Sequence, residues 1–369
     1  MESTLSPGHP TNSPEKTAPA PARKAPALAF LRYQFMAMDV FIISFMLVVI
    51  LWTLLSMVAP WARFYSHSDS YLWAEMPKAA LLSRFVMILG AYVIAQRFGI
   101  YYQRRFASIG IKAPLWLSIA NLVYVFIPIL LIPIVFNLLG AFIAGVSGAP
   151  AIQGHPHFDP AVNYDRAATW WDLWMKQADI SIAGVYPAQW FRQYQAPWLT
   201  GLMLLSYLSY YVSPLIAVGP QILKRDWLKV RLCAAVFAGA LMTTYVGYIC
   251  VPATGPRFEG GFKAWLPEQA GWFGAPWWQN MLNDAEVIRW DAFPSGHVAI
   301  ATVALVVALK YHRKTGLGYL PFVTLLPLAT VFLGYHYLMD VAFGLLFAAF
   351  AFFAIEPAAK WWESIWATE

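Results

Sequence analysis

The stretch Phe293-Pro294-Ser295-Gly296-His297 stands where a polar, aromatic-rich segment gives way to the apolar run 298–309. Proline and serine at a predicted helix start, followed by glycine, leave backbone N–H groups without intrahelical partners, and a helix N-terminus of this kind attracts anions. The histidine in the next position would lie beside an anion bound there. The pentapeptide is a weak signal by itself, because a Pro-Ser-Gly turn near a histidine also occurs by chance.

The composition of the chain is that of a membrane protein. Of its 369 residues, 60% are hydrophobic and only 12% are charged, whereas a soluble domain carries about 25% charged residues. The aromatic share of 17%, with 18 tryptophans, is typical of interfacial belts. The net charge of +6 is explained by basic cytoplasmic loops, since no outer face remains for a nucleic-acid-binding stripe. We therefore expect an all-α, multi-pass transmembrane bundle without a nucleic-acid partner.

Long apolar runs predict about eight membrane-spanning helices. The third run holds Pro128 and Pro133 and is too long for one perpendicular helix, so it forms either one kinked span or two. Residues 1–30 are rich in Pro, Ala, Ser and Thr, which predicts a disordered tail. The eight runs lie at about 36–57, 79–95, 114–147, 199–218, 232–251, 297–310, 319–334 and 341–355.

Basic residues favour a single crossing of the third run. With one crossing, the loops 97–113, 222–231 and 310–316, each with three or four Lys and Arg residues, share a side with the tail. The positive-inside rule makes that side cytoplasmic and gives eight spans with both termini cytoplasmic. Residues 31–113 then form two N-terminal helices, and residues 114–369 form the other six, with extracytoplasmic loops 148–197 and 253–291.

Two further segments strengthen the signal at His297. One is Val-Pro-Ala-Thr-Gly-Pro-Arg at 251–257, and the other is Leu-Gly-Tyr-His-Tyr-Leu-Met-Asp at 333–340. Under the eight-span topology all three segments emerge on the extracytoplasmic side. The motifs were not defined by their side of the membrane, so this convergence points to one shared site. The loop 148–197, rich in tryptophan, predicts a helix that lies along the membrane surface.

The residue types at these three segments suit phosphoryl transfer. His336 and Asp340 are four positions apart, so on a helix the carboxylate accepts a hydrogen bond from the ring and leaves the other ring nitrogen nucleophilic. His297 would protonate a leaving oxygen. Arg257 would bind the phosphate through its planar guanidinium group. Ser295 and the backbone N–H groups near Gly296 would hold the remaining oxygens, and this set requires no metal or cofactor.

Each residue also has a simpler explanation. A histidine at the end of a span is often an interfacial side chain, Arg257 could be a snorkelling anchor, and Asp340 could cap its helix. Four such residues at one membrane depth are costly, however, and this favours function. A lipid or solute transporter is the alternative from another class, although it would place polar groups near the middle of the bilayer.

The three motifs resemble those of the type 2 phosphatidic acid phosphatase superfamily. The likeness covers about the last 190 residues and consists of Gly-Pro-Arg at 255–257, Pro-Ser-Gly-His at 294–297 and His-Tyr-x-x-Asp at 336–340. The resemblance implies that His336 forms a phosphohistidine, that Asp340 orients it and that His297 is the acid. It also implies a six-helix core, here preceded by two extra spans.

Two of the motifs depart from the usual pattern of that superfamily. Cys250 stands where the first motif normally has a lysine, and Ala329 and Thr330 stand where the third motif normally has Ser-Arg. With fewer cationic residues, these motifs resemble those of the branch that contains inositol phosphorylceramide synthase and its bacterial relatives. A phosphate monoester carries nearly two negative charges at neutral pH and a diester one, so the loss of two cations favours a phosphodiester donor. Arg84 is a candidate replacement for a missing cation.

The resemblance implies a lipid phosphate or phospholipid substrate for a membrane enzyme. The phosphohistidine would pass its phosphoryl group to an alcohol, which makes a phosphotransferase, or to water, which makes a phosphatase. We expect location in a bacterial inner (cell) membrane with the site extracytoplasmic; the oligomeric state stays open. The five tryptophans of 258–290 fit either a lid over the site or an interfacial anchor.

Overall fold

The computed structural model describes residues 36–58, 77–108, 134–136, 138–140, 142–143, 169–224, 226–258, 277–278, 280–282 and 290–366. Within these ranges the chain forms helices and no β-strand, which confirms the predicted all-α class. The predicted tail at 1–30 lies outside the described residues. So does most of the third apolar run, of which only short helical pieces within 134–143 are described.

Six helices of the described part are long and apolar enough to cross a membrane, and a seventh apolar helix is shorter. The six are α2 (Ala37–Val58), the first 18 residues of α3 (Lys78–Ser108), α7 (Pro197–Leu223), α8 (Trp227–Cys250), α11 (Arg313–Phe332) and a continuous unit of 28 residues. That unit consists of α12 (Leu338–Phe350), the π-helical segment Ala351–Ile355 and most of α13 (Glu356–Trp366). The shorter one is α10 (Gly296–Tyr311). The smaller elements are α5 (Trp170–Ala183), α6 (Pro187–Trp190) and the 3₁₀ turns Phe191–Tyr194 and Pro256–Phe258.

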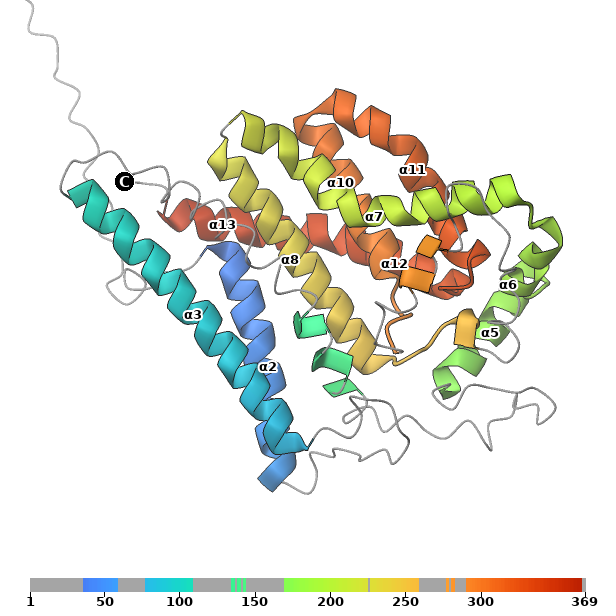
Figure 1. Ribbon diagram of the computed structural model, residues 1–369, viewed down its shortest axis with the longest axis horizontal. Coiled ribbons are helices and arrows are strands. Elements are labelled where there is room, and N and C mark those ends of the chain that lie inside the picture. The colour runs from blue at the N-terminus through green and yellow to red at the C-terminus, as the bar shows by residue number, and fades with distance from the viewer. Residues whose placement is uncertain are drawn as a thin grey trace, which may run out of the picture.

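Helix α10 is the centre of the bundle. Its 16 residues rise about 24 Å at 1.5 Å per residue, which is less than the hydrocarbon thickness of about 30 Å. It packs against α7, α8, α11 and α12. Helices α2 and α3 lie together at one edge of the molecule (Figure 1). Small side chains let these helices approach closely. The fully buried residues of α10 are mostly of this kind: Val298, Ala299, Ala301, Val303, Ala304 and Ala308.

Several predicted loops are shorter in the structure because helices continue into charged sequence. Helix α3 runs through its arginines to Ser108, and α7 and α8 are separated only by residues 224–226. Asp226 begins α8 as its N-cap, where its side chain accepts a hydrogen bond from the backbone N–H of Lys229 at 3.3 Å. The predicted loop at 310–316 shrinks to His312. The lengths of the apolar runs therefore underestimate the lengths of these helices, which continue into polar sequence at their ends.

The C-terminal helix α13 ties the bundle together at the end away from the three motifs. Glu363 accepts a hydrogen bond from the backbone N–H of Ala37 at 3.1 Å and forms an ion pair with Arg231 at 2.5 Å. Glu356 pairs with Lys360 at 2.6 Å and with Lys310. These contacts join the first turn of α2, the start of α8 and the end of α10.

Candidate active site

The three sequence motifs lie together, joined by backbone hydrogen bonds. The N–H of Arg257 donates to the carbonyl of Gly334 at 2.8 Å, which joins the first motif to the third. The N–H of Ser295 donates to the carbonyl of Asp340 at 2.9 Å, which joins the second to the third. The N–H of Ala292 donates to the carbonyl of Ala253 at 3.0 Å. These bonds hold segments of distant sequence at one end of the bundle.

His336 is held by a backbone carbonyl. Its Nδ1 lies 2.8 Å from the carbonyl oxygen of Ala292 and 3.5 Å from Oδ2 of Asp340. A carbonyl oxygen only accepts, so Nδ1 carries a proton and Nε2 of the neutral ring does not. That Nε2 faces Nδ1 of His297 at 3.4 Å. The site therefore presents an unprotonated nitrogen of one buried histidine to the ring of the other.

The pairing of His336 with Asp340 differs from the helical pair that we expected. His336 precedes α12, whose N-cap is Tyr337 in an extended conformation, so the two residues do not share a regular helix. Asp340 is fully buried, and its Oδ2 accepts the backbone N–H of Tyr337 at 2.7 Å. Its carboxylate thus closes the turn that carries His336 and contacts the ring at longer range than Ala292 does.

An aromatic stack links His297 to Arg257. The ring of Tyr207 lies 4.4 Å from that of His297 at an interplanar angle of 30°, and 4.6 Å from that of Tyr335 at 20°. The guanidinium carbon of Arg257 lies 4.7 Å from the centre of the Tyr335 ring. Tyr210 also contacts His297, with ring centres 4.4 Å apart. The sequence did not predict a role for Tyr207, because a tyrosine inside an apolar span gives no signal of what it packs against.

The structure gives Ser295 and Gly296 local structural contacts. Ser295 is fully buried, and its hydroxyl oxygen accepts the backbone N–H of Val298 at 3.3 Å, which makes Ser295 the N-cap of α10. A Cβ at Gly296 would collide with the hydroxyl of Tyr248. Glycine is therefore the residue that fits this turn, and the predicted contacts with phosphate stay predictions.

Helix α5 contributes two buried aspartates that the sequence motifs did not predict. It was predicted only as a helix along the membrane surface, and its exposed Trp170 and Trp174 agree with that expectation. Asp172 and Asp179 are seven positions apart and therefore share one face of the helix. Both are buried against the motif segments, although burial raises the pKa of each carboxyl, that of Asp179 to about 7. The capping-box spacing of Thr169 and Asp172 is the one sequence signal for this helix start.

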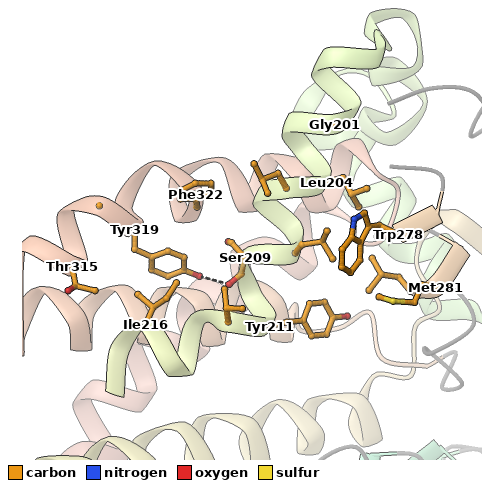
Figure 2. Close-up of a pocket in the computed structure, with 15 residues that line it drawn as sticks. Gly201, Leu204, Ser209, Tyr211, Ile216, Trp278, Met281, Thr315, Tyr319 and Phe322 are labelled. Atoms are coloured by element: carbon orange, nitrogen blue, oxygen red, sulfur yellow. Dashed lines mark hydrogen bonds between the residues drawn. The ribbon is translucent and has the colours of Figure 1, made fainter. Parts of the chain in front are cut away.

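An apolar cavity of about 730 Å³ lies between α7 and α11 (Figure 2). Tyr211 lines this cavity, and its ring centre is 6.2 Å from that of His297, so the cavity neighbours the paired histidines. Trp278 and Met281, from the described part of 258–290, also line it. Most of the remaining lining is aliphatic or aromatic: Leu204, Leu205, Leu208, Val212, Ile216, Leu282 and Phe322.

Arg84 is exposed on α3, which packs on α2 at one edge of the molecule (Figure 1), and its role as a replacement cation stays a prediction. At one of the two positions that lack a cation, the backbone carbonyl of Thr330 accepts the N–H groups of Tyr335 and His336, at 2.9 and 3.2 Å. Thr330 thus supports the turn that carries His336.

One comparison with known proteins found a family model that matches part of the chain. The comparisons with curated proteins and with solved structures each gave no match. A family model described as the PAP2 superfamily matches residues 174–354, a segment that begins in α5 and ends in the π-helical segment. The chain therefore matches the PAP2 superfamily, whose members are generally phosphatases or phosphotransferases, over a segment that contains all three motifs.

Proposed function

We propose that the protein is a membrane phosphatase or phosphotransferase that acts on lipid phosphate esters through a phosphohistidine at His336. The observation that carries the proposal is the orientation of this ring, with Nδ1–H directed to Ala292 and Nε2 directed to His297. A nucleophilic histidine needs this tautomer, because the attacking nitrogen must have a free electron pair. The match to the PAP2 superfamily supports the proposal at the level of the reaction class.

In the proposed first step, Nε2 of His336 attacks phosphorus, the N–P bond forms and the bond to the leaving oxygen breaks. His297 in its protonated form gives its proton to that oxygen. Arg257 is the proposed cation for the non-bridging oxygens. In the second step an alcohol or water attacks phosphorus, its proton passes to His297, and the N–P bond breaks. Both histidines then return to their starting states.

The short contact between the histidines implies that they part when substrate binds. An in-line transfer needs phosphorus about 3 Å from Nε2 of His336, with the leaving oxygen beyond it and within hydrogen-bond reach of His297. The two nitrogens are only 3.4 Å apart. The phosphoryl group must therefore displace one ring, and the stacked Tyr207 limits where the ring of His297 can move.

The acceptor and the kind of ester follow from the charge of the site. With Cys250 and Thr330 at the positions where cations are usual, we infer that a monoanionic phosphodiester is the donor and that an alcohol is the acceptor, as in the inositol phosphorylceramide synthase-like branch. Hydrolysis of a lipid or polyprenyl phosphate is the alternative outcome of the same intermediate. The apolar cavity beside Tyr211 suits a hydrocarbon chain of either substrate.

We propose that the site faces the extracytoplasmic side, with both termini cytoplasmic. The basic residues Lys224, Lys229, Lys310 and Arg313 lie at the ends of α7, α8, α10 and α11 that are opposite the motifs, as the positive-inside rule requires. Cys250 is exposed at the motif end of α8, whereas Cys233 is buried. A membrane-impermeant maleimide should therefore label Cys250 in intact cells, and Cys250→Ser should remove the label. Labelling only after permeabilisation would indicate the opposite topology, with the site facing the cytoplasm.

The proposed reaction is tested with purified protein, a chelator and three substrates: phosphatidic acid, undecaprenyl diphosphate, and phosphatidylinositol with ceramide. Free phosphate identifies a phosphatase, and a headgroup found on ceramide identifies a transferase. His297→Ala and His336→Ala should each abolish turnover while expression is unchanged. Turnover retained by either variant would overturn the proposal. Accumulation of lipid in sealed vesicles without chemical change would indicate a transporter instead.

A further inference from the structure

Asp172 binds the turn of the first motif. Its Oδ1 accepts the N–H of Thr254 at 2.8 Å, the N–H of Gly255 at 3.0 Å and the hydroxyl of Thr254 at 3.0 Å. The hydroxyl of Tyr337 reaches the same oxygen at 3.3 Å. Its Oδ2 accepts the N–H and the hydroxyl of Thr169, at 2.8 and 3.1 Å. One carboxylate thus joins the start of α5, the first motif and the third.

The turn that Asp172 holds determines where Arg257 lies. Gly255 has a φ of +89°, a conformation that other residues rarely adopt, and a Cβ there would collide with the carbonyl oxygen of Tyr335. Two residues later, Arg257 donates its N–H to Gly334 and lays its guanidinium group over the Tyr335 ring. Loss of the Asp172 contacts would release this turn and shift the guanidinium group away from the ring.

Asp179 binds the turn that carries His336. Its Oδ2 accepts the N–H of Leu338 at 2.8 Å and its Oδ1 accepts the N–H of Met339 at 3.2 Å. These are the first two N–H groups of α12, which have no partner within the helix. Because α12 begins two residues after His336, the position of its first turn sets the position of the ring.

We propose that Asp172 and Asp179 are positioning residues that hold Arg257 and His336 at the separation that phosphoryl transfer requires. The inference rests on the proposed function and deepens it. Neither carboxylate touches the reacting atoms; Asp172 acts mainly through the turn of the first motif and Asp179 through the backbone of the third. Both project from one face of α5, so a single helix at the membrane surface sets the spacing of two motifs about 80 residues apart in sequence.

The two aspartates predict different kinetic changes. Asp172→Ala should raise KM about tenfold with a smaller effect on kcat, because Arg257 binds the substrate phosphate before the reaction. Asp179→Ala should lower kcat about 100-fold with little change in KM, since misplacement of a nucleophile by about 1 Å costs on this order. Asp172→Asn keeps one acceptor oxygen and should restore most of the loss. Gln177→Ala, at an exposed position of α5, is the matched control and should change neither constant.

Amide hydrogen exchange tests the same inference without catalysis. Asp172→Ala should speed exchange at Thr254 and Gly255 and leave Leu338 and Met339 protected; Asp179→Ala should do the reverse. If the wild type lacks activity on every substrate but the exchange pattern appears, the proposed function fails and the positioning role of α5 stands. Unchanged kinetics and exchange in both variants would overturn the inference, as would a uniform rise in exchange across the chain.

Discussion

His336 donates its Nδ1–H to the backbone carbonyl of Ala292 at 2.8 Å, and that acceptor cannot be removed by a side-chain substitution. This bond and the side chain of Asp340, whose Oδ2 is 3.5 Å from Nδ1, share the task of orienting the ring. Where a carboxylate alone holds a catalytic histidine, its replacement by an amide costs about 10⁴-fold in kcat.

Asp340→Asn should therefore be a milder change in this protein. We expect kcat to fall about 10- to 100-fold, because Ala292 preserves the tautomer while the turn that Asp340 closes at Tyr337 loosens. Steady-state assays of Asp340→Asn beside His336→Ala measure the difference. A loss as complete as that of His336→Ala would mean that Asp340, not Ala292, controls the ring.

The stack of Tyr207 on His297 predicts that the aromatic ring matters more than its hydroxyl group. Tyr207→Phe keeps both ring contacts and should retain most of kcat. Tyr207→Leu loses two stacking contacts, each of about 0.5–1.5 kcal/mol, and should lower kcat about tenfold or more. Activity assays on folded protein, with thermal unfolding as the control, compare the two. Equal losses in both variants would show that the stack does not position His297.

Much of this arrangement was predictable from the sequence. The rest could not be predicted, and the reasons are physical. The convergence of His297, His336 and Arg257 followed from the length of the apolar runs and the distribution of basic residues. The contact of His336 with the carbonyl of Ala292 could not be predicted from the sequence, because every residue has a backbone carbonyl. Asp179 contacts Leu338 of α12, 159 positions later in the sequence, and no local sequence pattern indicates a contact over that separation. Helix ends were misjudged where charged residues such as Lys229 continue a helix.

The cavity between α7 and α11 predicts a dependence on the length of the lipid chain. Gly318 lines the cavity, and a Cβ there meets no atom within 4 Å. Gly318→Phe should fill the space and raise KM for a long-chain lipid phosphate several-fold, while KM for a short-chain, water-soluble analogue stays unchanged. Gly219→Phe is the matched control, since that position also has open space but does not line the cavity. Equal effects on both substrates would exclude the cavity as the chain site.

Asp179 predicts a particular dependence of stability on pH. Burial, with a smaller contribution from the charge of Asp340, raises the pKa of this carboxyl from 3.8 to about 7, although two backbone hydrogen bonds lower it. Between these pH values the folded protein keeps a proton that the unfolded chain releases, so the free energy of unfolding falls as pH rises. Asp179→Asn should flatten this part of the profile in unfolding measurements on the solubilised protein. Parallel profiles for the two proteins would contradict the assignment.

The most direct measurement is rapid quenching of the enzyme with a lipid substrate labelled at phosphorus, followed by mapping of the labelled peptide under alkaline conditions that preserve phosphohistidine. The account predicts label on Nε2 of His336, because Nδ1 of this ring is directed to Ala292 and Nε2 faces the place of the substrate. Label on Nδ1, label on another residue, or turnover with inversion of configuration at phosphorus would contradict it.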